Sequence, residues 1–129
     1  MKINEVNHIA INTLDINETI EFYKEALHLP LIEKVDCGDL MLAYMKIKEN
    51  SFLELFDLKG NCKKGILPEE QQGLRHIAFE VEEITAWYEH LKKVKVKFVQ
   101  HLTAFEPVGN NVILFEDPNG VVIELCEKI

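Results

Sequence analysis

Two glutamates stand in strongly apolar stretches of this sequence, Glu54 in SFLELFDL and Glu124 in GVVIELCE. A buried carboxylate costs free energy unless a cation or hydrogen-bond donors neutralise its charge. Each glutamate is preceded by a histidine in another apolar stretch, His8 in NHIAI and His76 in RHIAF. These four residues are the candidates for chemistry.

A divalent cation would account for two imidazoles and two carboxylates together. It balances the charge of two carboxylates, and neutral imidazole and carboxylate are ordinary ligands of first-row metals. Four protein ligands leave two positions of an octahedron open for water or a bidentate substrate, as in a catalytic site. Nickel, cobalt, zinc, manganese and iron all accept this ligand set.

The alternative for each residue is a structural role. A histidine on an apolar strand can hydrogen-bond to the backbone, and a buried glutamate can pair with Arg or Lys. Arg75 is the chain's only arginine, lies next to His76 and is expected on the opposite face. Repetition of the His–Glu pair favours the metal. The other histidines have no such glutamate and are expected at the surface: His28, His90 and His101.

The spacing comes from an internal repeat. Residues 7–29 and 75–96 each begin with His-Ile-Ala in an alternating apolar segment and continue into an amphipathic helical pattern. The glutamate follows its histidine by 46 positions in the first half and by 48 in the second. We interpret residues 1–129 as one domain of two modules, 1–68 and 69–129.

Each module is predicted to run strand, helix and three strands, an α+β arrangement. Asp15 is the predicted N-cap of the first helix, with Glu18 three positions later. The strands are expected near 29–36, 40–47, 51–58, 96–102, 111–116 and 121–127, with a turn at DPNG. Both faces of the strands are apolar, which predicts helices on the outer face and the four polar side chains on the inner one.

The composition excludes several classes of function. The chain has 129 residues and a formal net charge of −8, which disfavours binding to nucleic acid or to an anionic membrane. No apolar run approaches the roughly 20 residues of a membrane span, and the N-terminus lacks a signal-peptide pattern. The three cysteines have no CxxC spacing and are expected as free thiols. A cytoplasmic protein is expected.

Three segments together resemble the vicinal oxygen chelate superfamily: NHIAINTLDINETIEFYKEALHLPLIEK, GLRHIAFEVEEI and NVILFEDPNGVVIELCE. That superfamily includes glyoxalase I (lactoylglutathione lyase), methylmalonyl-CoA epimerase, extradiol dioxygenases and bleomycin-resistance proteins. The resemblance implies paired βαβββ modules in a half-open, cup-shaped barrel around a metal, commonly in a homodimer. It places the metal ligands on His8, Glu54, His76 and Glu124, and it is closest to glyoxalase I.

The resemblance also implies a mechanism. In glyoxalase I the metal holds two adjacent oxygens of a hemithioacetal while a glutamate moves a proton between neighbouring carbons. Glu124 is our choice for that base, and Glu54 is the symmetric candidate for the step that returns the proton. The short chain resembles the nickel- or cobalt-activated bacterial enzymes, with zinc also a candidate. The positions that contact glutathione there are Asn12 and Leu58 here, both uncharged, so the substrate stays open.

Two other functions fit the same resemblance. One is a metal-poor small-molecule binding protein of the bleomycin-resistance type. The other is a resistance enzyme that opens an epoxide with water or a thiol. The segment 58–74 is the candidate for a loop at the site, where Lys59, Lys63 and Lys64 would either meet an anionic substrate or lie in solvent.

Overall fold

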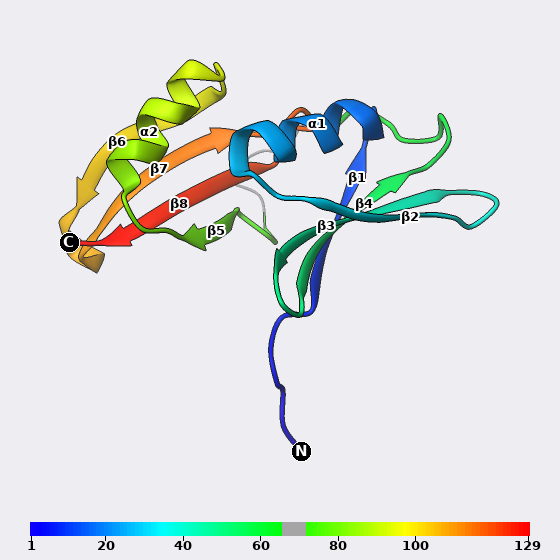
Figure 1. Ribbon diagram of the computed structural model, residues 1–129, viewed down its shortest axis with the longest axis horizontal. Coiled ribbons are helices and arrows are strands. Elements are labelled where there is room, and N and C mark those ends of the chain that lie inside the picture. Colours follow the sequence, from blue (N-terminus) through cyan, green and yellow to red (C-terminus); the bar gives the residue numbers. More distant parts are fainter. Residues whose placement is uncertain (66–71) are drawn as a thin grey trace. The chain divides into compact units, whose positions relative to one another are not determined.

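The computed structural model describes residues 1–65 and 72–129. The chain divides into two compact units, Met1–Gly65 and Ile66–Ile129. The predicted module boundary between residues 68 and 69 lies outside the described residues. Both units have the order strand, helix and three strands, so the predicted α+β class is confirmed (Figure 1).

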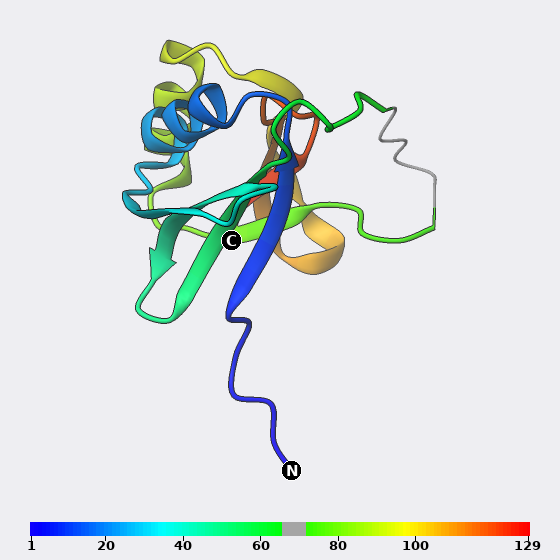
Figure 2. The ribbon, with the colours of Figure 1, turned by 90° about the vertical axis from the view of Figure 1, so that its right-hand side faces the viewer.

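The first unit contains β1 (His8–Thr13), α1 (Ile16–Leu27), β2 (Leu31–Asp36), β3 (Met41–Lys48) and β4 (Ser51–Asp57). Its sheet has the order β1-β4-β3-β2, with β1 parallel to β4 and the other neighbours antiparallel. Residues 1–7 precede the edge strand β1 as an extended, exposed segment (Figure 2).

The second unit repeats this topology with β5 (Ile77–Glu80), α2 (Ile84–Lys93), β6 (Lys97–Phe105), a short 3-10 turn η1 (Glu106–Val108), β7 (Asn110–Glu116) and β8 (Val122–Lys128). The order is β5-β8-β7-β6, again with one parallel pair, β5 and β8. The predicted strands therefore agree with the observed ones within a few residues. The predicted DPNG turn is present, with Gly120 at a φ of 80°.

The two helices begin by different means. Asp15 caps α1 as predicted, because its Oδ1 accepts the Glu18 backbone N–H at 3.1 Å. The N-cap of α2 is Glu83, whose own side chain makes no capping hydrogen bond. Instead, the carboxylate of Glu127 on β8 accepts the N–H groups of Glu83 at 2.6 Å and of Ile84 at 3.3 Å. A strand residue therefore satisfies the first turn of α2.

One face of each sheet packs on its own helix. α1 contacts β3 and β4, and α2 contacts β6, β7 and β8. Burying each large apolar side chain contributes roughly 1.5–3 kcal/mol. On these helix-covered faces the buried apolar strand residues are Ile11, Ala43, Met45, Leu53 and Leu55 in the first unit, and Ile77, Ile113, Phe115, Ile123 and Leu125 in the second. Glu54 and Glu124 alternate with these residues and so lie on the other face of each sheet.

Candidate metal centre

In the first unit, His8 and Glu54 occupy neighbouring parallel strands. His8 on β1 stands opposite Phe52 of β4, and Glu54 stands opposite Ala10. His8 and Glu54 are thus two residues apart in register and share the face that α1 leaves uncovered. Glu54 is 8% exposed, whereas His8 is exposed.

The second unit repeats this register. Ala78 stands opposite Glu124 in the parallel pair β5–β8, and His76 precedes the first residue of β5. The His76 Nε2 lies 3.1 Å from the Glu124 Oε2, and the two side chains are 29% and 17% exposed. The His76 Nδ1 is buried without a hydrogen-bond partner among the described residues. The sheet therefore brings this predicted pair into direct contact.

Two residues that the sequence analysis did not single out contact the first pair. The Asn7 Oδ1 lies 2.8 Å from the His8 Nδ1. Tyr44 stands directly opposite Glu54 in the antiparallel pair β3–β4. Its hydrogen bond to the Glu54 carboxylate, with burial and the carboxylate charge as further causes, raises the pKa of Tyr44 to about 12. The sequence could have indicated Asn7, because it is adjacent to His8. Tyr44 could be assigned to Glu54 only from the register between β3 and β4.

The donor chemistry fits a divalent cation. Two imidazoles and two carboxylates are acceptable ligands for a first-row metal, and the unpartnered nitrogen of His76 shows an imidazole whose hydrogen bonding is incomplete within the described chain. Across residues 1–65 and 72–129, no group of three or more His, Cys, Asp or Glu side chains is arranged so that it could hold a metal ion. The four predicted ligands thus occur as two pairs, each of one histidine and one glutamate: His8 with Glu54 in the first unit and His76 with Glu124 in the second.

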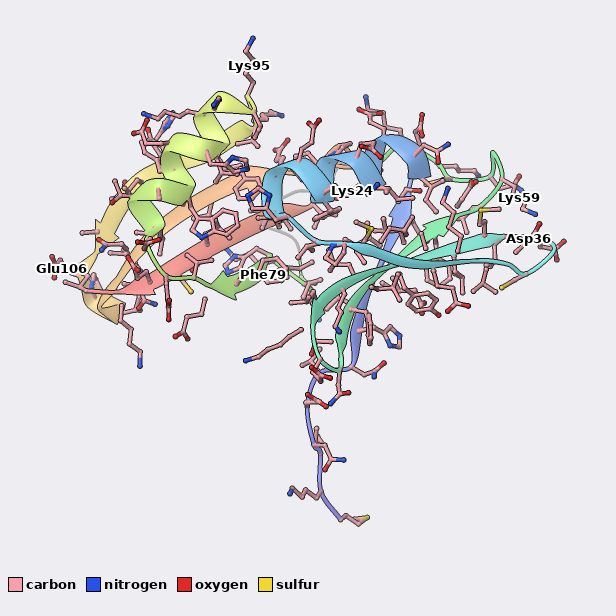
Figure 3. All side chains as sticks on the ribbon, viewed as in Figure 1. Lys24, Asp36, Lys59, Phe79, Lys95 and Glu106 are labelled. Carbon is pink, nitrogen blue, oxygen red and sulfur yellow. The ribbon has the colours of Figure 1, made fainter. Side chains whose placement is uncertain are left out.

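The remaining candidates have other surroundings. Lys59 donates to the Asp36 Oδ1 at 2.9 Å and to the Gly38 carbonyl at 2.6 Å, so it ties the β2–β3 turn to the segment after β4 (Figure 3). Lys63 and Lys64 are exposed, and residues 66–71 of the predicted loop lie outside the described residues.

The other histidines are mostly at the surface, as predicted. His28 and His101 are exposed, whereas His90 is half-buried, with its ring centroid 6.0 Å from that of Trp87. Asn12 is exposed and Leu58 is half-buried.

The cysteines are free thiols, as predicted. Cys126 lies on β8, and its Sγ is 3.6 Å from the Phe79 carbonyl. Burial raises the pKa of the Cys126 thiol, and the charge of Glu124 raises it further. A thiol held in its neutral form is a poor nucleophile and a poor metal ligand.

Known proteins are similar to this chain in sequence and in fold. The chain is 32% identical to the metallothiol transferase FosB of Staphylococcus epidermidis, over 97% of this chain and 82% of that protein. It is 31% identical to the "Probable lactoylglutathione lyase" of Synechocystis sp., over 93% and 92% of the two chains. The crystal structure of the glyoxalase family protein from Enterococcus faecalis superposes with a TM-score of 0.83 at 27% identity, over 98% of this chain and 100% of that one.

The described part of the chain contains no helix long and apolar enough to cross a membrane.

Residues 5–125 match the Glyoxalase/Bleomycin resistance protein/Dioxygenase superfamily. Since this match covers most of the chain and agrees with the relatives and the fold, the protein belongs to that superfamily.

Proposed function

We propose that the protein is a metal-dependent lyase or isomerase of the glyoxalase I type. It moves a proton between neighbouring carbons of a hemithioacetal or a related small oxygenated substrate. The observation that carries this proposal is the contact of 3.1 Å between the His76 Nε2 and the Glu124 Oε2. The equivalent register of His8 and Glu54 in the first unit supports it.

The proposed metal ligands are His8, Glu54, His76 and Glu124. They belong to both modules, so the ion would be held within one chain or by two copies in a homodimer. Nickel, cobalt and zinc are the first candidates, and manganese and iron are the next. A divalent ion bound there would lower the pKa of a C–H group beside the substrate oxygens and stabilise negative charge that develops on them.

Glu124 is the proposed base. Its carboxylate accepts the proton as the C–H bond breaks and returns it to the neighbouring carbon, so the substrate is isomerised without net gain or loss of atoms. Glu54 is the symmetric candidate. The Tyr44 hydroxyl already donates to Glu54 and restrains its carboxylate. Glu124 has no such tyrosine across from it, because Leu114 stands opposite on β7.

The first experiment is elemental analysis of protein purified without chelator, compared with Glu124→Gln, Glu54→Gln and the surface control Glu80→Gln. We expect close to one divalent ion per site in the wild type and in the control, and a large loss in the other two variants. Substoichiometric metal, with no effect of Glu124→Gln on metal content, would favour the small-molecule binding protein instead.

The second experiment determines the substrate class. Methylglyoxal and, in a parallel assay, a small epoxide are each supplied with glutathione and, separately, with other low-molecular-weight thiols, and product formation is followed with the metal-loaded protein. Turnover of a thiol adduct supports the glyoxalase chemistry. Addition of the thiol to an epoxide, with no isomerisation of any adduct, would replace the proposed reaction by thiol transfer.

A further inference from the structure

The segment before β1 is anchored where it presents Asn7 to His8. The Asn7 carbonyl accepts the Phe52 N–H at 2.9 Å, and the Val6 carbonyl accepts the Ser51 hydroxyl at 2.8 Å. The Asn7 side chain therefore projects from a backbone that is fixed on both sides. Its Oδ1 is 2.8 Å from the His8 Nδ1, a good hydrogen-bond distance.

The other end of the Asn7 side chain sets the orientation of its amide. The Nδ2 group donates to the Asn50 carbonyl at 3.5 Å, a long contact that only a donor can make. This leaves the amide oxygen toward His8. Because an amide oxygen only accepts hydrogen bonds, the His8 Nδ1 must carry the proton. A neutral imidazole has one N–H, so the His8 Nε2 carries the free lone pair.

We propose that Asn7 is a positioning residue for His8. It selects the tautomer with Nδ1–H and holds the ring, so that the Nε2 lone pair is available to a cation before the cation arrives. This inference rests on the proposed function, because it assigns the lone pair to the proposed metal. Metal-ligating histidines commonly donate their second N–H to such an acceptor, and loss of the acceptor typically lowers metal affinity by roughly 10–100-fold.

The second module provides an internal contrast. Arg75 precedes His76 as Asn7 precedes His8. A guanidinium has donors and no acceptor, so Arg75 cannot accept an imidazole N–H. Correspondingly, the His76 Nδ1 has no hydrogen-bond partner in the described part of the chain, and the Nε2 faces Glu124 instead. The two histidines thus differ in what their Nδ1 atoms contact, and Asn7 accounts for the contact at His8.

The first test measures the tautomer in the metal-free full-length protein. Long-range proton–nitrogen NMR of the imidazoles is recorded at roughly pH 8.5, where an ordinary histidine is neutral. We expect Nδ1–H for His8 in the wild type and in the control Asn17→Leu, and a shift toward Nε2–H, which a free imidazole favours in water, in Asn7→Leu. An unchanged tautomer in Asn7→Leu would overturn the inference.

The second test measures binding of Ni²⁺ to the same proteins by calorimetry. We expect binding to weaken roughly 10–100-fold in Asn7→Leu. In Asn7→Asp, whose carboxylate also accepts from Nδ1, binding should be at least as tight as in the wild type. A merely structural role would weaken both variants. If the wild type binds Ni²⁺ and Asn7→Leu binds equally well, the inference fails while the proposed function stands. If the wild type binds none, the proposed function fails.

Discussion

The His76 Nε2 lies 3.1 Å from the Glu124 Oε2, although 47 residues separate them in the sequence. The contact follows from the parallel pairing of β5 and β8, which places Glu124 opposite Ala78, two residues after His76. The same register recurs between β1 and β4. Each unit thus places one imidazole and one carboxylate in the same relative register.

Binding of a divalent ion should stabilise the folded protein. A ligand at about 100 times its Kd contributes about 2.7 kcal/mol, which for a chain of this size raises Tm by on the order of 10 °C. Addition of Ni²⁺ should therefore raise Tm in the wild type and in Glu80→Gln, and much less in Glu124→Gln. Differential scanning fluorimetry measures the three shifts. Equal shifts in all three proteins would exclude Glu124 as a ligand.

Tyr44→Phe should lower the free energy of unfolding even without metal. The substitution removes the hydroxyl that donates to the carboxylate of Glu54, a buried residue. Hydrogen bonds to charged groups contribute about 1.5–3 kcal/mol. Urea unfolding of the metal-free protein checks this value. Tyr88→Phe is the matched control, because that hydroxyl bonds to His101, which is exposed, and a smaller loss is expected there.

Glu127→Ala should loosen the first turn of α2. The variant leaves the Glu83 and Ile84 N–H groups without their carboxylate acceptor. Loss of an N-cap acceptor costs about 0.5–2 kcal/mol. Hydrogen exchange at these two amides should accelerate in Glu127→Ala and less in Glu127→Gln, which keeps one oxygen. Exchange at the two amides should stay unchanged in the exposed control Glu82→Ala. Unchanged exchange in Glu127→Ala would show that Glu127 does not protect these N–H groups.

The Lys59–Asp36 ion pair predicts a specific pH dependence. The hydrogen bond from Lys59, then that from the Gly38 N–H and the lysine charge, lower the pKa of Asp36 below its ordinary value. An acid whose folded pKa is lowered stabilises the fold above its unfolded pKa, about 3.9, and this contribution is lost as the pH falls through the folded pKa.

The difference in Tm between the wild type and Lys59→Met should therefore be present at neutral pH and shrink below about pH 4. High salt should also reduce it, because both side chains reach solvent, Lys59 at 37% exposure and Asp36 at 62%. Lys24→Met is the control, since its partner Glu21 lies farther away, at 3.5 Å. A Tm difference for Lys59→Met that is constant from pH 7 to about pH 3 would contradict this role of the ion pair.

Much of the fold was predictable because its signals are local. The alternation of apolar residues predicted the strands, and Asp15 with Glu18 predicted the start of α1. On α2, local spacing was a poorer guide to which side chains are buried. Four apolar or aromatic residues of α2 recur at helical spacing, yet Ile84 and Leu91 are buried whereas Trp87 and Tyr88 are only half-buried. Helical spacing predicts the direction of a side chain and not how much of it the neighbouring strands cover.

By itself, the sequence determined the repeated module and the four ligand-type side chains, because periodicity, turn residues and internal repetition are properties of neighbouring positions. Only the tertiary structure decided which groups meet these side chains: Asn7 at His8, Tyr44 at Glu54, and Glu124 at His76. It also decided that Glu127 caps α2. The physical reason is that strand register and loop anchoring depend on pairing between distant segments, where a shift of one residue turns every side chain to the other face.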